Sequence, residues 1–264
     1  MYQDILLSVE ARVATITLNR PQVSNALSKA SYGEIQDAVS ACEQDEQVGC
    51  IVITGAGKHF SAGGDIASFK RLIESGAYLS EDSIRAAAGM SSGIRRCCKP
   101  VVAMINGVAT GAGLSVALAC DFRIGTPSSK LIMAFIKMGL SGDTGSILLL
   151  HKLVGAGTAA EMIMTGAPVG GEQAHRLGLF SRLAEEGQLE AETYAFAGTL
   201  ANGPLFALKK QKELINAFFY SELDAFTEAE TKAMAACSRT KDFEEAVNAF
   251  SEKRTPQFTG QSPR

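Results

Sequence analysis

Two apolar segments, each followed by a glycine-rich loop and then by a helix-like stretch, constrain the fold of this chain most strongly. CIVITGAG (residues 50–57) leads into HFSAGGDI, and PVVAMI (residues 100–105) leads into NGVATGAGLS. Continuous apolar runs that end at glycine are typical of strands buried on both faces of a sheet. Strands that alternate with helices in this way predict an α/β core.

Other segments fit the same plan. VATITL (residues 13–18) largely alternates polar and apolar residues, which predicts a strand, and residues 28–44 have the spacing of an amphipathic helix with Ser28 as its N-cap. We expect residues 65–96 to be helical and polar. We expect PVVAMINGVA (residues 100–109) to form one buried strand.

The C-terminal part of the chain differs in pattern from the rest. From residue 201 onward it is helical in pattern, charged and poor in glycine. We therefore expect two parts, a core formed by residues 1–200 that holds the functional site and a helical region formed by residues 201–264. The second part is expected to pack on the core or on a neighbouring subunit.

Composition argues against several classes of protein. The chain has 264 residues and a formal net charge of −3 at pH 7, so no basic surplus indicates a nucleic-acid partner. Its apolar runs are short and interrupted by glycine, which argues against a membrane span, and we find no signal-peptide pattern. Six cysteines without a CxxC pair and three histidines without metal-ligand spacing favour free thiols, no metal site and a cytoplasmic location.

Both glycine-rich loops are candidates for binding an anionic oxygen. Each lies at the carboxyl end of a predicted strand and opens a helix, so backbone N–H groups stay free and the helix N-terminus adds positive partial charge. Two such N–H groups that converge on one point would stabilise a developing oxyanion. Taken one at a time, the loops are equally well explained as ordinary tight turns.

A lone acid in an apolar segment is the third candidate. In AFIKMGLSGDTGSILLL (residues 134–150), Asp143 lies between Gly142 and the sequence Thr-Gly-Ser. Asp and Gly both favour turns, and Asp often caps a helix, so a turn alone would explain the residue. Two loops of the oxyanion type together with this acid favour a catalytic site.

Four motifs, in this order, closely resemble those of the crotonase (enoyl-CoA hydratase/isomerase) superfamily: NRP…NAL, FSAGGD, KPVVAMINGVATGAGLSVALACD and TGAPVGGEQAHRLGLFSRL. The resemblance covers most of the chain. It implies a spiral of ββα units, C-terminal helices that assemble a homotrimer or a dimer of trimers, and an acyl thioester substrate. The thioester is one of coenzyme A or of a carrier protein, with no tightly bound cofactor. The amides of Gly64 and Ala112 would hold its oxygen.

The resemblance also bears on the reaction. Hydratases of this superfamily use two glutamates, and their positions are occupied here by Ser115 and Phe135. A third position, at which some isomerases place their acid, is Asp143. The resemblance to this single-acid branch implies an enoyl-CoA isomerase, in which Asp143 takes a proton from C2 of a 3-enoyl thioester and returns it to C4. Apolar neighbours such as Phe135 and Leu140 would raise the pKa of Asp143 by desolvation.

Several different reactions stay open. A reaction like that of 4-chlorobenzoyl-CoA dehalogenase, or acyl-CoA hydrolysis, would use Asp143 as a nucleophile. The dehalogenase branch, however, has a histidine and a tryptophan where this chain has Ala88 and Phe135. An enoyl-CoA hydratase and a non-catalytic homologue stay open as well.

The resemblance further implies which residues touch the substrate. It places the acyl-pantetheine part beside Ala62, Ile66, Ser115, Phe135 and Leu140. It places the nucleotide part of coenzyme A near Ser24, Ala26 and the lysines of LKKQK, Lys209 among them. A basic residue is common in the centre of the NRP…NAL loop, but Val23 and Ser24 stand there in this chain. The lysines are equally well explained as a solvated helix face.

Overall fold

The structure is a computed structural model that describes residues 2–263. Its strands are β1 (Ile5–Glu10), β2 (Val13–Leu18), β3 (Cys50–Gly55), β4 (Val101–Ile105), β5 (Val108–Thr110), β6 (Phe122–Gly125), β7 (Lys130–Ile132), β8 (Val169–Gly170) and β9 (Arg182–Leu183). Its helices are α1 (Lys29–Gln44), α2 (Ile66–Glu74), α3 (Glu81–Arg96), α4 (Ala112–Ala119), α5 (Ser146–Thr165), α6 (Gly171–Arg176), α7 (Leu189–Ala201), α8 (Leu205–Phe219), α9 (Leu223–Cys237) and α10 (Lys241–Ser251). Two 3-10 helices, η1 (Pro21–Val23) and η2 (Ala134–Met138), complete the elements.

Two sheets organise the fold. The larger has six strands in the order β1-β2-β3-β4-β6-β9, and β5, β7 and β8 form the smaller. Within the larger sheet β1 runs antiparallel to β2, whereas the other neighbouring pairs are parallel. Helices lie between successive parallel strands, so the α/β prediction is confirmed.

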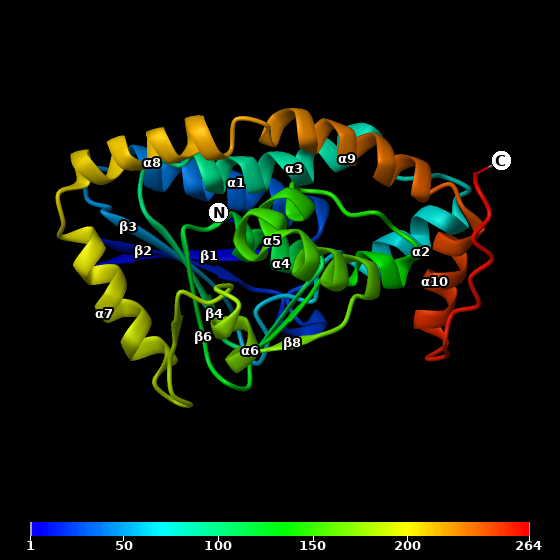
Figure 1. The fold of residues 1–264 in the computed structure, drawn as a ribbon, viewed down its shortest axis with the longest axis horizontal. Helices are drawn as coiled ribbons and strands as arrows, with labels where there is room; N and C mark the ends of the chain where they lie inside the picture. The colour runs from blue at the N-terminus through cyan, green and yellow to red at the C-terminus, as the bar shows by residue number, and fades with distance from the viewer. Residues whose placement is uncertain (1, 264) are drawn as a thin grey trace.

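The central strands are buried on both faces. Ile51 and Ile53 of β3 belong to a core that also contains side chains of α1, α3 and α4. Cys50 and Val52 of the same strand belong to a second core cluster, which includes Ala197 of α7. Helices α1 and α3 therefore lie on one side of the larger sheet and α7 on the other (Figure 1). This two-sided burial explains why β3 is a continuous apolar run.

The segment predicted as one strand over residues 100–109 is two strands in different sheets, so that prediction was wrong. β4 ends at Ile105 and β5 begins at Val108. Between them the side-chain amide of Asn106 donates to the carbonyls of Gly55 and Gly57 at 2.8 and 2.9 Å. A Cβ on Gly107 would lie 2.2 Å from the carbonyl oxygen of Lys58, so only glycine fits at this crossing between the sheets.

One further expectation about local structure needs adjustment. The polar stretch at residues 65–96 is helical, but it forms two helices, α2 and α3, separated by residues 75–80 with Gly76 at a φ of +70°. Strand β1 has a single buried residue, Ile5, which explains why its pattern gave no clear signal. The prediction for α1 is confirmed, and the Ser28 hydroxyl accepts from the amides of Ala30 and Ser31.

Helix α5 is longer and more apolar than we expected when we argued that the apolar runs of this chain are too short for a membrane span. It has 20 residues, and its mean hydropathy over an 18-residue window is 1.4, so by length and composition alone it could cross a membrane. The helix is broken at Gly155, where φ is 75° and ψ is 170°. It packs against α4 and η2, and 28% of that window is buried in the single chain. Length and composition are therefore weak evidence for a membrane span here.

The C-terminal helices lie along one side of the molecule. Helix α9 packs on α3, and α10 packs on α2 and η2. In Figure 1, α8 lies at the end of the molecule opposite to α2 and α10. The division into two parts at residue 200 stays a prediction.

Candidate active site

A cavity of about 230 Å³ lies where the two glycine-rich loops meet the segment that contains Asp143. Its walls also include side chains from α1, α2, η2, α9 and α10. Seven of the residues predicted for the site line it: Ala62, Gly64, Ile66, Ala112, Phe135, Leu140 and Asp143. The structure therefore brings together residues that are up to 81 positions apart in the sequence.

The two loops are held side by side by backbone hydrogen bonds. The amide of Ser61 donates to the carbonyl of Val108 at 3.1 Å, and the amide of Thr110 donates to the carbonyl of Ser61 at 3.0 Å. The loops thus pair like neighbouring strands just before each reaches its candidate donor. This pairing fixes Gly64 relative to Ala112.

The amides of Gly64 and Ala112 have no acceptor within residues 2–263. The backbone groups on either side of the Gly64 amide do form hydrogen bonds. The amide of Leu27 donates to the carbonyl of Gly63 at 2.7 Å, and the carbonyl of Leu27 accepts from the amide of Asp65 at 3.2 Å. Ala112 is the first residue of α4, where an N–H group has no partner inside the helix. Both amides are therefore free to donate to an oxygen bound in the cavity.

Asp143 presents a buried carboxyl group to the same cavity. The residue is 6% exposed, and its Oδ1 atom is buried without a hydrogen-bond partner among the described residues. Burial raises the pKa of Asp143 from 3.8 to about 6. Its backbone carbonyl accepts from the amide and the hydroxyl of Ser146, at 3.2 and 2.8 Å, so the residue also forms the predicted turn. A carboxyl with this pKa can take and return a proton near neutral pH.

The other two candidate positions contribute no acid. The hydroxyl of Ser115 donates to the carbonyl of Gly111 at 3.2 Å, and the side chain is fully buried within α4, away from the cavity lining. Ser115 is therefore a helix residue in this structure, and its predicted contact with substrate is not supported by its position. Phe135 lies in the cavity wall as an apolar group.

Side chains that the sequence did not single out complete the wall. Tyr32 of α1, Phe69 of α2 and Met234 of α9 line this cavity and also a second cavity of about 260 Å³. Asp143 lines both cavities as well. Burial, and then the charge of Asp143, raise the pKa of the Tyr32 hydroxyl. No local motif marks Tyr32, because only the tertiary fold brings α1 to this place.

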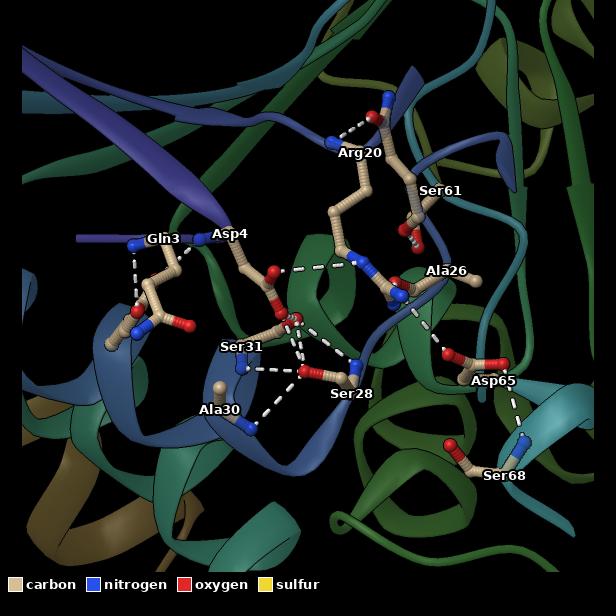
Figure 2. A network of polar contacts seen from close by, with 12 residues as sticks. Gln3, Asp4, Arg20, Ala26, Ser28, Ala30, Ser31, Ser61, Asp65 and Ser68 are labelled. Carbon is tan, nitrogen blue, oxygen red and sulfur yellow. Dashed lines mark hydrogen bonds and ion pairs between the residues drawn. The ribbon is translucent and has the colours of Figure 1, made fainter. Parts of the chain in front are cut away.

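The NRP…NAL segment braces the first glycine loop from behind. The guanidinium of Arg20 donates to Asp65 Oδ2 at 3.1 Å and to the carbonyl of Ala26 at 2.7 Å, and it lies 3.5 Å from Asp4 Oδ1 (Figure 2). Asp65 Oδ1 also accepts from the amide of Ala67, so Asp65 is the N-cap of α2. The carboxyl group of Asp65 therefore has a structural role: it pairs with Arg20 and caps α2.

Ser24 and Ala26, which were predicted to contact the nucleotide, lie in the same NRP…NAL segment that supports the first glycine-rich loop. The amide of Ala62 donates to the carbonyl of Ser24 at 2.8 Å, and Ala26 is buried. Neither residue lines the cavity. Asn25 between them donates to the carbonyls of Ala56 and His59 at 2.9 and 2.7 Å.

The lysines of LKKQK fall into two groups. Lys212 is buried, and its ammonium group donates to Asp121 Oδ2 at 2.7 Å and to the carbonyl of Lys99 at 2.9 Å, so it is a structural residue. Lys209 is exposed on α8, the helix that lies at the end of the molecule opposite to α2 and α10 (Figure 1). Within one chain it does not line the cavity, and its predicted contact stays a prediction.

Comparisons with known proteins agree with this arrangement. A family model described as enoyl-CoA hydratase/isomerase matches residues 8–261. The chain is 32% identical to trans-2-decenoyl-acyl-carrier-protein isomerase of Streptococcus mutans, over 98% of this chain and 99% of that protein. It is 33% identical to 1,2-epoxyphenylacetyl-CoA isomerase of Escherichia coli (98% and 100%) and to crotonyl-CoA hydratase of Syntrophomonas wolfei (97% and 98%).

Solved structures show the same fold. A crystal structure of an enoyl-CoA hydratase from Mycobacterium avium subspecies paratuberculosis superposes with a TM-score of 0.90 at 30% identity, over 98% of this chain and all of that one. The fold class expected from the sequence motifs, the crotonase type, is therefore confirmed. The relatives include both isomerases and hydratases, so likeness alone leaves the reaction open.

Proposed function

Because the chain belongs to the enoyl-CoA hydratase/isomerase family, we propose that it is an isomerase that converts a 3-enoyl thioester into the 2-enoyl form. One observation carries the proposal. Asp143 is the single carboxyl group among the described residues that line the cavity with the free amides of Gly64 and Ala112. A 1,3-proton shift needs one group that both removes and returns a proton, and this site offers one.

In the proposed reaction the thioester carbonyl oxygen accepts hydrogen bonds from Gly64 and Ala112. The Asp143 carboxylate removes a proton from C2, and the electrons of that C–H bond delocalise into a dienolate. The protonated Asp143 then donates the same proton to C4, which leaves the double bond between C2 and C3. No water is consumed, and the carboxylate is regenerated.

The two amides make the first step feasible. The hydrogens at C2 of a thioester are weak acids, and a carboxylate removes them at a useful rate only if the dienolate is stabilised. Loss of one oxyanion donor typically costs about 3 kcal/mol of transition-state stabilisation. The two fixed donors in a partly apolar cavity therefore lower the barrier by about two such increments.

Hydration fits the cavity less well. Two-acid hydration needs one carboxylate to activate water and another to protonate carbon. The residues at the two corresponding positions are Ser115, whose hydroxyl is bonded to Gly111, and Phe135, which is apolar. Asp65 reaches only the second cavity, and it is engaged by Arg20.

Reactions that use Asp143 as a nucleophile also fit less well. Hydrolysis of the resulting covalent intermediate needs a group that activates water, for which histidine is the usual choice. The described residues that line the two cavities include no histidine, and Ala88 stands where a dehalogenase would have one.

The test compares the wild type with Asp143→Asn on 3-enoyl-CoA and on the matching carrier-protein thioester, and follows the absorbance of the conjugated product. We expect the wild type to form product on at least one carrier, and the variant to lose about a hundredfold or more in kcat, as expected for loss of the proton-transferring group. Equal rates would exclude Asp143 from the mechanism.

Turnover in oxygen-18 water separates the proposal from its rivals. An isomerase incorporates no label, whereas hydration, hydrolysis and dehalogenation each place oxygen from water in the product. Calorimetric binding of an acyl-CoA distinguishes an enzyme from a non-catalytic homologue that has lost its ligand.

We also propose that the chain assembles as a homotrimer or a dimer of trimers through its C-terminal helices. Helix α8 leaves Phe206, Phe218 and Phe219 at least 65% exposed in the single chain, which is unusual for large aromatic side chains. Sedimentation equilibrium tests this, with the monomer mass as the result that excludes it.

A further inference from the structure

Glu230 is a buried acid close to Asp143 that the proposed reaction does not use. It lies on α9, is 4% exposed and has no cationic partner within residues 2–263. Its carboxylate instead accepts from the backbone amides of Gly145 at 2.6 Å and Ile147 at 3.3 Å. A buried acid without a counter-ion is costly unless hydrogen bonds compensate it, so these two bonds account for its charge.

The amide of Gly145 belongs to the turn that presents Asp143, and the amide of Ile147 lies in the first turn of α5, which follows directly. This turn passes through Gly142, Thr144 and Gly145 at φ values of 113°, 64° and 74°. A β-branched residue such as Thr144 rarely adopts a positive φ, and it does so at a cost unless its surroundings hold it there. Glu230 of α9 supplies such a restraint, because it accepts a hydrogen bond from the amide of Gly145, the residue that follows Thr144.

Glu230 does not meet the substrate space directly. Asp143 lines both cavities, whereas Glu230 lines neither. Any influence of Glu230 on the reaction must therefore pass through the backbone of the turn and through the electric field at Asp143.

We propose that Glu230 is a positioning residue, which anchors the Gly142–Gly145 turn to α9 and thereby aims the Asp143 carboxyl into the cavity that contains the amides of Gly64 and Ala112. The effect of Glu230 on catalysis rests on the proposed function, in which Asp143 transfers the proton. The structural tie itself is independent of the reaction.

The charges of the two acids are coupled. Burial, and to a smaller degree the charge of Asp143, raise the pKa of Glu230 to about 7, although its bonds to the two amides act in the opposite direction. Asp143 ionises at the lower pH of the two, so Glu230 still holds its proton when Asp143 becomes charged, and that charge then favours the protonated form of Glu230. Around this pair lie Tyr32 and Lys137 in the first cavity wall and Lys29 and Asp65 in the second.

The test uses three variants of the whole chain. Glu230→Gln keeps the size and removes the charge, and it places an NH2 group against one of the two amides. Glu230→Asp keeps the charge but is one methylene shorter, so it cannot reach both amides. Glu228→Gln is the matched control, because Glu228 lies on the same helix, has a side chain that is 42% exposed and pairs with Arg85.

Two readouts are needed. The first is the steady-state rate with a 3-enoyl-CoA, for which Glu230→Gln and Glu230→Asp are expected to lose about tenfold to a hundredfold in kcat with little change in KM, because a displaced catalytic group costs this much. The second is a carbon-13 NMR titration of the Asp143 carboxyl, assigned through its absence in Asp143→Asn. Glu230→Gln is expected to move this titration to lower pH, because release of the turn exposes the Asp143 carboxyl to water, and burial is what raises its pKa.

The titration decides the inference without reference to any reaction. If Asp143 titrates in Glu230→Gln as it does in the wild type and in Glu228→Gln, Glu230 is not coupled to it and the proposal is wrong, whatever happens to kcat. If Glu230→Asp retains the full wild-type kcat, the tie to both amides is not what positions Asp143, and the proposal is again wrong. If Asp143→Asn remains active while the titration moves, the proposed function fails and the link between Glu230 and Asp143 stands.

Discussion

Gly113 lies so close to Ser61 that a Cβ atom on Gly113 would come within 2.5 Å of both Cβ and Oγ of Ser61. The contact joins the first turn of α4 to the first glycine-rich loop. The distance between the amides of Gly64 and Ala112 therefore depends on residue 113 having no side chain.

Gly113→Ala is expected to separate the loops and to lower kcat/KM by about tenfold or more, because a shift of an ångström at a reactive site has effects of this size. It should also destabilise the fold by about 1–3 kcal/mol through overpacking. Gly33→Ala is the control, since a Cβ at Gly33 on the exposed face of α1 meets nothing within 4 Å. Gly33→Ala should keep full activity and raise the unfolding midpoint slightly. Equal activity of the two variants would show that the loops tolerate separation.

The pKa of Asp143 predicts how the rate depends on pH. The carboxylate is the form that removes a proton, and burial raises the pKa of the group to about 6. The value of kcat/KM should therefore increase about tenfold per pH unit below 6 and level off above it. A profile measured between pH 4.5 and 8.5 tests this. A rate that decreases as pH rises through 6 would mean that the protonated acid is the active form.

The same pKa predicts that ionisation of Asp143 lowers the free energy of unfolding of the wild type at neutral pH. A carboxyl whose pKa is raised by folding, from 3.8 to about 6, favours the folded state while it is protonated. That contribution is complete below pH 4 and is lost as pH rises through 6, and the shift of about two units corresponds to about 3 kcal/mol. Asp143→Asn should thus be more stable than the wild type at pH 8 by up to this amount.

Urea unfolding of both proteins at pH 4.5 and pH 8 measures the difference directly. Titrating groups that do not interact with Asp143 affect both proteins alike, so the change in the difference between them with pH reports on Asp143 together with Glu230, whose pKa the charge of Asp143 raises. A difference that stays constant between the two pH values would show that burial does not perturb the group.

Much of the site could be predicted from local sequence, because it is built from chain segments with their own signatures. Gly64, Ala112 and Asp143 each lie in a glycine-containing turn, and such turns are visible without knowledge of the fold. Their convergence was inferred from the resemblance to known motifs, and in the structure all three residues line one cavity.

The parts that could not be predicted depend on tertiary contacts. Glu230 lies in a helix that is charged on its exposed face, and only the packing of α9 shows that this one acid reaches the amide of Gly145. Only two residues, Asn106 and Gly107, separate the apolar residues of β4 from those of β5. The sequence therefore gives little indication that the chain passes from one sheet to the other there. Ser115 was a candidate by position, and its bond to Gly111 became visible only in the structure.

Tyr32 lines two neighbouring cavities, and the size of its side chain should determine the length of acyl chain that the enzyme accepts. The half-buried ring lines both the cavity of about 230 Å³ that contains the free amides and the neighbouring cavity of about 260 Å³. Tyr32→Ala should join them, so that an acyl chain bound beside Asp143 can extend into the second space. Since each buried methylene contributes about 1 kcal/mol or more to discrimination, the ratio of kcat/KM for a long relative to a short enoyl-CoA should rise about tenfold.

Tyr32→Phe is the matched control, because it keeps the ring and removes only the hydroxyl. It should leave the chain-length preference of the wild type unchanged, while any effect of the hydroxyl on Asp143 appears equally with long and short substrates. The measurement is kcat/KM for a series of 3-enoyl thioesters of increasing length with all three proteins. If the Ala and Phe variants show the same preference, the ring is not the boundary between the cavities, and the acyl chain takes another path past Phe69 and Met234, which line both spaces.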